Sequence, residues 1–179
     1  MSAVLFDLDG VLYEGDTPIT GAAKTVSWFR KNRIPYLFLT NTTSISREQL
    51  VSKLNGFGID CHTEDFLTPP VAATQWMTEK GIKDIALFVP ESTQDEFSLF
   101  SLHEEEDDKV EAVVIGDLGE RWDFATMNRV FRLLINNPEA KLIALGMTRY
   151  WRNKGKLPLV VGPIVKAVEY ATDRKPRVT

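Results

Sequence analysis

Two aspartates stand two residues apart at the end of the first apolar segment of the chain. The segment Ala3–Leu8 has the residue types of a buried strand, and Asp7 and Asp9 are followed at once by Gly10. Because residues two apart on a strand point to the same side, we expect the two carboxylates to project together. Gly10 allows the chain to turn sharply directly after them. Two carboxylates placed in this way repel each other unless a cation, a proton or a positive ligand balances their charge.

This pair predicts a reactive site at the end of a strand. Open α/β sheets bind ligands in the crevice outside the carboxyl ends of their strands. We therefore interpret Asp7 as a nucleophile and Asp9 as a group that moves protons, with Mg²⁺ as the balancing cation. The alternative interpretation is an exposed acidic turn, since Asp and Gly are ordinary turn residues.

A second polar pair follows the next predicted strand. Tyr36–Leu39 is apolar and leads directly into Thr40 and Asn41. Neighbouring parallel strands lie about 4.8 Å apart. We therefore expect the Thr40 hydroxyl and the amides that follow it to reach an oxygen of a phosphoryl group on Asp7. Taken alone, Thr40-Asn41 is also an ordinary turn before a helix.

The elements that position these residues alternate between strand and helix. Residues 22–33 carry apolar side chains at helical spacing, and Pro35 lies directly beyond this helix. A second helix is predicted over 47–55, with Ser46 and Gln49 forming a capping box at its start. The order of strand, helix, strand and helix predicts an α/β fold with a parallel sheet.

A second α/β stretch begins after Leu67–Pro70, where we place the domain boundary. Helices are predicted over 71–79, 124–134 and 164–171, and strands over 84–89, 112–115 and 142–145. Five consecutive acids at 104–108 are interpreted as a solvated loop.

Composition limits the classes of partner and compartment. The chain has 179 residues, of which 44% are hydrophobic and 26% charged, with a formal net charge of -4. The acidic balance argues against nucleic acid as a partner, and no apolar run approaches the roughly 20 residues of a membrane helix. No signal peptide is predicted. The single cysteine, Cys61, excludes an internal disulfide and favours a reducing compartment, so we expect a cytoplasmic location.

The ordered motifs resemble those of the haloacid dehalogenase-like phosphatase superfamily. Phe6–Leu12 is similar to the first motif of that superfamily and Leu39–Asn41 to the second. The resemblance covers essentially the whole chain and narrows to the nitrophenylphosphatase-type and phospholysine/phosphohistidine phosphatase group, which has a large α/β cap inserted after the second motif. The supporting segments are Val113–Asp117, Leu142–Leu145, Arg149–Trp151 and Val168–Thr172.

The resemblance implies a division of the chain into a core and a cap. Residues 1–68 would form the N-terminal part of a Rossmann-like parallel-sheet core, and 69–172 the cap. Residues 173–179 would begin the return to the core. The cap would select the substrate through Thr148–Trp151 and through the turn at Gly162-Pro163.

The resemblance also implies a Mg²⁺-dependent phosphatase that acts on a small phosphorylated metabolite through an aspartyl-phosphate on Asp7. Asp9 would protonate the leaving oxygen and then deprotonate the hydrolytic water. Asp7 and Asp9 would hold Mg²⁺, and Gly10, Thr40 and Asn41 would bind the phosphate.

The chain departs from the family pattern beyond Thr172. Lys175-Pro176 superficially resembles the lysine motif of the family but follows Thr172 too closely, and the final acidic motif has no candidate. We therefore expect an incomplete core with two strands, in a chain about 80 residues shorter than the family pattern. A second copy could cover the exposed sheet edge, which makes a homodimer one expected partner.

Loss of these motifs predicts impaired activity and leaves two other functions open. Removing a single electrostatic stabiliser can cost about 10²–10³ in rate. One alternative is a non-catalytic variant that binds a partner or a phosphorylated ligand through the cap. The other is a phosphoacceptor signalling domain, which also places acids at strand ends, although the large second α/β stretch weakens that interpretation.

Overall fold

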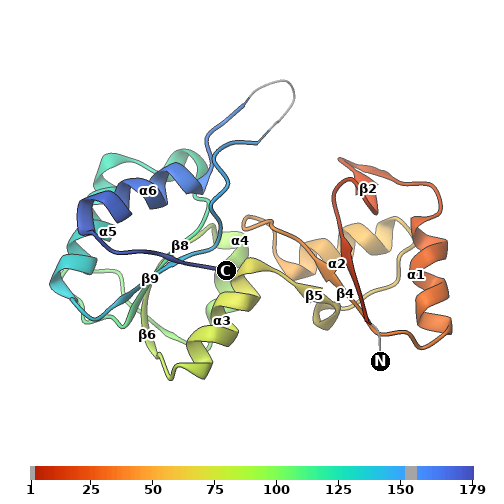
Figure 1. The fold of residues 1–179 in the computed structure, drawn as a ribbon, viewed down its shortest axis with the longest axis horizontal. Coiled ribbons are helices and arrows are strands. Elements are labelled where there is room, and N and C mark those ends of the chain that lie inside the picture. The colour runs from red at the N-terminus through yellow and green to blue at the C-terminus, as the bar shows by residue number, and fades with distance from the viewer. Residues whose placement is uncertain (1–2, 152–156) are drawn as a thin grey trace. The chain divides into compact units, whose positions relative to one another are not determined.

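A computed structural model describes residues 3–151 and 157–179 of the chain. The chain divides into two units, Met1–Thr68 and Pro69–Thr179, each with its own sheet (Figure 1).

The first unit has a three-stranded parallel sheet in the order β1-β4-β5. β1 (Val4–Asp7) pairs with β4 (Tyr36–Leu39), and β4 pairs with β5 (Phe66–Leu67). The helices are α1 (Ala22–Lys31) and α2 (Arg47–Gly56), and a small antiparallel hairpin joins β2 (Tyr13–Glu14) to β3 (Thr17–Pro18). A 3₁₀ turn, Thr63–Asp65, precedes β5. The third strand is not predicted from the sequence because two residues are too short to show a period.

One face of this sheet is buried and the other is open within the unit. Phe6, Leu8 and Phe38 belong to a core cluster with side chains of α1 and α2. The alternating residues Leu5 and Leu39 are 59% and 39% exposed. This is the alternation expected of strands that are covered on one side only.

The second unit has a five-stranded parallel sheet in the order β10-β9-β8-β6-β7. Its strands are β6 (Asp84–Phe88), β7 (Ser101–Leu102), β8 (Ala112–Ile115), β9 (Lys141–Ala144) and β10 (Arg177–Val178). Its helices are α3 (Pro69–Glu79), α4 (Glu91–Gln94), α5 (Phe124–Asn136) and α6 (Val161–Thr172), with 3₁₀ turns at Asp95–Phe97 and Gly119–Arg121.

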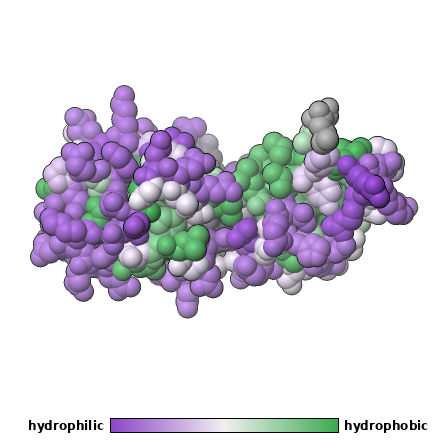
Figure 2. Space-filling view, turned by 90° about the horizontal axis from the view of Figure 1, so that it is seen from below, coloured by the Kyte–Doolittle hydropathy of each residue, from purple (hydrophilic) through white to green (hydrophobic). Residues whose placement is uncertain are grey.

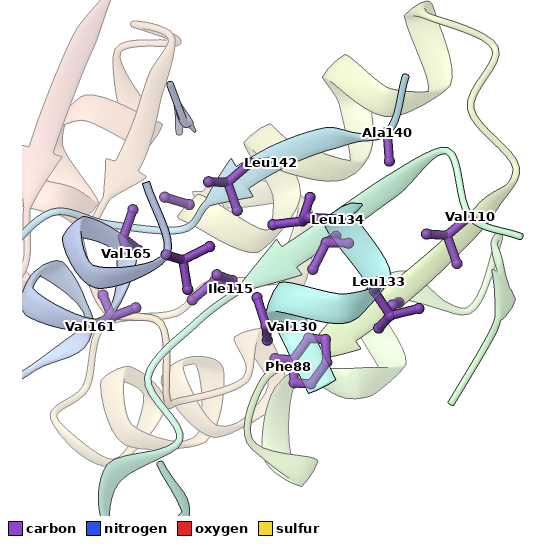
Figure 3. Packing of buried hydrophobic residues seen from close by; sticks show 14 residues of the cluster. Phe88, Val110, Ile115, Val130, Leu133, Leu134, Ala140, Leu142, Val161 and Val165 are labelled. Atoms are coloured by element: carbon purple, nitrogen blue, oxygen red, sulfur yellow. The ribbon is translucent and has the colours of Figure 1, made fainter. Parts of the chain in front are cut away.

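Helices bury both faces of this second sheet. On one face, side chains of α5 and α6 such as Val130 and Val165 pack on Ile115 and its neighbours (Figure 3). On the other face, Met77 of α3 belongs to a cluster with Val114. All four residues of β8 are therefore buried, which is typical of a central strand in a parallel sheet and accounts for its continuous apolar sequence.

Further differences from the sequence prediction lie at the start of α3, at the start of α6, which begins at Val161 rather than at 164, and in the tail. α3 begins at Pro69, two residues earlier than expected, because proline is tolerated in the first turn of a helix. Residues 173–179 were expected to begin the return to the first unit. Instead Arg177 and Val178 pair with Ile143 and Ala144 of β9, and this hydrogen-bonded pairing makes the tail an outer strand of the second sheet.

The face of the molecule in Figure 2 is mainly hydrophilic, as expected for a chain in which 26% of the residues are charged. On the face seen in Figure 2, hydrophilic residues predominate and hydrophobic residues form separate patches. Within the described ranges, no helix combines the length and apolarity needed to span a bilayer.

Candidate functional site

The carboxyl ends of β1 and β4 bring the two predicted polar pairs to one edge of the first sheet. The register pairs Asp7 with Leu39, and both strands end at these residues. Thr40 follows one position later, and its amide donates to the Leu67 carbonyl at 3.3 Å. The pattern of parallel pairing, rather than proximity in sequence, thus places Asp7 beside the turn that begins at Thr40.

Burial of Leu8 directs the two aspartates to the same side. Leu8 is completely buried in the core of the first unit, and Asp7 and Asp9 on either side of it are exposed. The Leu8 carbonyl accepts hydrogen bonds from Val11 and Leu12 at 3.3 and 2.8 Å, which closes a tight turn. Gly10 has a φ of 81° in this turn, a conformation that favours glycine. The arrangement follows the alternation that the sequence predicts.

The negative charge of this pair has no cationic partner among the described residues. Neither Asp7 nor Asp9 forms an ion pair there, and the Asp7 side chain accepts a hydrogen bond only from the Leu8 amide, at 2.9 Å. Burial, together with the nearby charges of Asp9 and Asp7, raises the pKa of the Tyr13 phenol above its ordinary value. The two carboxylates therefore leave an uncompensated negative field at the end of β1.

This donor set is compatible with Mg²⁺. Across residues 3–151 and 157–179, no group of three or more His, Cys, Asp or Glu side chains forms a metal cluster. Mg²⁺ keeps several waters and often takes only one or two protein carboxylates together with substrate phosphate. Asp7 and Asp9 supply two oxygen-bearing groups of this kind.

The turn after β4 offers both a hydroxyl and a backbone amide as hydrogen-bond donors. The Thr40 hydroxyl already accepts a hydrogen bond from the Thr42 amide at 3.2 Å. Asn41 is exposed, and no hydrogen bond to it is found within the described part of the chain. An oxygen ligand at this edge could therefore meet both the amide of Asn41 and the O–H of Thr40, because a hydroxyl that accepts one hydrogen bond can still donate its own proton.

The corresponding position in the second unit is filled. β7 lies on one side of β6 and β8 lies on the other, so the order in which the chain adds strands reverses between β6 and β8. Ligands of doubly wound sheets bind at such a switch point. Gly116 follows β8 there and is buried. A Cβ added to it would lie 3.0 Å from Val89 Cγ1 and 3.2 Å from Leu145 Cδ1. Side chains occupy this crevice, so the first unit is the better candidate for chemistry.

Two hollows elsewhere on the surface include neither Asp7 nor Asp9. One of about 570 Å³ is lined by Arg30, Tyr36 and His62 among others, next to the amino end of β4. The other, of about 480 Å³, is lined by residues such as Trp76 and Lys141 in the second unit. Each lies at the amino ends of strands, whereas Asp7 lies at a carboxyl end.

The segments expected to select a substrate differ in exposure. Tyr150 and Trp151 are 50% and 53% exposed, and Tyr150 bridges to Leu159 in an antiparallel pair. Gly162 is instead buried, because its amide donates to the Thr148 carbonyl at 3.0 Å and α6 packs closely there. The expectation that Gly162 contacts substrate is therefore corrected to a packing role.

Cys61 and Tyr13 are two further residues of the first unit with distinctive surroundings. Cys61 is buried, and burial raises the pKa of its thiol to about 11, which leaves little thiolate for nucleophilic chemistry. Tyr13, for which the sequence predicts no role, lies on the hairpin directly after Asp7 and Asp9 and contacts Lys53 of α2. Only the fold reveals this contact, because the two residues are far apart in the chain.

Comparison with known proteins identifies the family to which this chain belongs. Residues 4–102 match the family described as Haloacid dehalogenase-like hydrolase. The human phospholysine phosphohistidine inorganic pyrophosphate phosphatase is 34% identical over 179 residues, which cover 98% of this chain and 64% of that protein.

Solved structures share the fold. A hypothetical protein from Pyrococcus horikoshii superposes with a TM-score of 0.91 at 23% identity, over 99% of this chain and 70% of that one. The glycerol phosphate phosphatase of Mycobacterium tuberculosis, solved in complex with magnesium, gives a TM-score of 0.84 at 23% identity, over 98% of this chain and 53% of that one.

The chain thus spans about two thirds, 64%, of the length of the human relative. The family match contains both strand ends, at Asp7 and Leu39, and the turns that follow them. This chain belongs to the haloacid dehalogenase-like hydrolases.

Proposed function

We propose that this protein is a Mg²⁺-dependent phosphatase that hydrolyses a small phosphorylated metabolite. The observation that carries the proposal is the uncompensated pair Asp7 and Asp9 at the carboxyl end of β1, beside the turn after β4. Family membership supports it, because the human relative is named as a phosphatase. The magnesium in the Mycobacterium tuberculosis phosphatase supports the choice of cation.

The reaction would proceed in two displacements at phosphorus. A carboxylate oxygen of Asp7 attacks, the new Asp7–phosphorus bond forms, and the bond to the leaving oxygen breaks. Asp9 donates its proton to that oxygen as it departs. Asp9 then takes a proton from a water molecule, whose oxygen attacks the phosphorus and displaces Asp7 to give inorganic phosphate.

The remaining groups would bind the metal ion and orient the phosphoryl group. Asp7 through its carboxylate and Asp9 through its backbone carbonyl would bind Mg²⁺, which when bound offsets the repulsion between an anionic nucleophile and an anionic substrate. The Asn41 amide and the Thr40 hydroxyl would donate hydrogen bonds to phosphoryl oxygens, whereas the Gly10 amide, also expected to bind phosphate, already donates to the Tyr13 carbonyl at 2.7 Å.

Hydrolysis of p-nitrophenyl phosphate by the 179-residue chain tests the proposal. We expect turnover that requires Mg²⁺, is lost with EDTA, and falls to background in Asp7→Asn because the nucleophile is gone. In Asp9→Asn, hydrolysis of an alkyl phosphate should fall by about 10²–10⁴, the usual contribution of general acid–base catalysis.

Glu14→Gln is the matched control, because Glu14 is an exposed acid on the neighbouring hairpin and should leave the rate unchanged. Turnover that survives in Asp7→Asn would disprove the assigned nucleophile. Absence of turnover in the unmodified chain, with no thermal stabilisation by Mg²⁺ and beryllofluoride together, would instead indicate a module without catalytic function.

A further inference from the structure

Tyr13 closes the turn that carries Asp9. Tyr13 is only 6% exposed, and it forms an isolated bridge with Asp9. Its carbonyl accepts a hydrogen bond from the Gly10 amide at 2.7 Å. The backbone position of Asp9 therefore depends directly on where Tyr13 is held.

Helix α2 holds the ring of Tyr13. The Lys53 ammonium lies 4.2 Å from the centre of the Tyr13 ring, and the Phe57 ring centre lies 5.7 Å from it. Lys53 lies in the last turn of α2 and Phe57 directly follows Gly56, the last residue of that helix, so both side chains contact the ring from the end of α2. We call these three residues the Tyr13 clamp.

The cation–ring contact is the stronger of the two charge interactions of Lys53. Its ammonium also lies 3.5 Å from the Asp16 carboxylate, but that side chain is fully exposed. Exposed ion pairs contribute little because water and salt screen them. The Lys53 side chain is 27% exposed, and a partly desolvated ammonium over an aromatic ring is attracted by the ring quadrupole.

Helix α2 is a firm support for this clamp. The Ser46 hydroxyl accepts from the Gln49 amide at 3.2 Å, and the Ser46 amide donates to the Gln49 side chain at 3.0 Å. Leu50 and Leu54 anchor the helix in the core of the first unit. A side chain of α2 that contacts the hairpin therefore restrains the position of the hairpin.

We propose that Lys53 and Tyr13 are positioning residues that hold Asp9 in place for proton transfer to the leaving oxygen. This inference rests on the proposed function of Asp9. Neither side chain is required to touch substrate, because each acts through the turn at Gly10.

The test compares two substrates that differ in their need for a proton. Lys53→Met keeps the apolar stem and removes the charge, Lys53→Arg keeps the charge, and Ser52→Ala alters a neighbouring exposed residue of α2. p-Nitrophenolate leaves without protonation, whereas the alkoxide of β-glycerol phosphate needs it. In Lys53→Met we expect β-glycerol phosphate hydrolysis to fall about tenfold, because small displacements of a catalytic group are costly. p-Nitrophenyl phosphate hydrolysis should change less than about twofold.

Lys53→Arg and Ser52→Ala should keep the ratio of the two rates. A merely structural role for Lys53 would lower both rates equally, and that result, or an unchanged ratio in Lys53→Met, would overturn the inference.

Amide hydrogen exchange provides a readout that does not depend on activity. In Lys53→Met the Gly10 amide should exchange about two- to fivefold faster, as expected for loss of a cation–π contact, whereas the Leu50 amide in α2 should not change. Unchanged exchange at Gly10 would refute the clamp even if the unmodified chain is active. If the unmodified chain hydrolyses neither phosphate, the proposed function fails, and exchange at Gly10 still decides whether the clamp exists.

Discussion

Gly162 offers a sharp test of the packing in the second unit. A Cβ added to this residue would lie 2.6 Å from the carbonyl oxygens of both Met147 and Thr148. Ordinary contact begins near 3.4 Å, so the backbone of one segment would have to move by about 0.8 Å. Such overpacking costs about 1–3 kcal/mol. The gain from replacing glycine by alanine in a helix, about 1 kcal/mol, offsets only part of it.

Gly56→Ala is the control that separates the two effects. Gly56 ends α2, and a Cβ added there would meet no atom within 4 Å. This variant should therefore be neutral or more stable by up to about 1 kcal/mol. The difference between the two variants, about 1–3 kcal/mol, then reports the clash at Gly162 because the backbone contribution is largely common to both.

Urea denaturation followed by circular dichroism and tryptophan fluorescence measures this difference. The second unit contains Trp76, Trp122 and Trp151, whereas the first contains Trp28, so fluorescence reports mainly on the second unit and circular dichroism on the helices of both. A Gly162→Ala protein as stable as Gly56→Ala would refute the close approach of α6 to residues 147–148.

Two further predictions concern the first unit. Ser46→Ala should lower its stability by about 1 kcal/mol through loss of the capping box, whereas Ser52→Ala should have no effect in the same urea titration. The pKa of the Cys61 thiol is raised from 9.0 to about 11 in the folded chain, so its stabilising contribution is complete below pH 9. That contribution should decline by at most about 3 kcal/mol between pH 9 and 11. Urea titrations over this range should show a shallower decline for Cys61→Ala, and parallel curves would contradict the buried thiol.

Homodimer formation stays a prediction of the sequence. The expected contact is at the sheet edge, whereas the exposed Leu5 and Leu39 lie on the open face of the first sheet.

The sequence predicts the features that depend on residues close to one another in the chain. The alternation around Leu8 directs Asp7 and Asp9 to one side, and strand periodicity predicts this from the sequence. The capping box at Ser46 is equally local, because a hydroxyl and an amide three residues apart recognise each other within one helical turn. The apolar run of β8 similarly marks a strand buried on both faces.

Tertiary structure decided the features that depend on partners distant in the chain. The short strands β5 and β10 exist because β4 and β9 supply hydrogen-bonding edges, and two residues show no period of their own. Gly162 is a packing residue only because α6 approaches the turn at Met147. The contact of Lys53 with Tyr13 forms because α2 crosses beside the hairpin. Residue types along the chain therefore predicted which carboxylates carry the proposed chemistry, and the fold determined what surrounds them, since packing between distant segments leaves no periodic signal in the sequence.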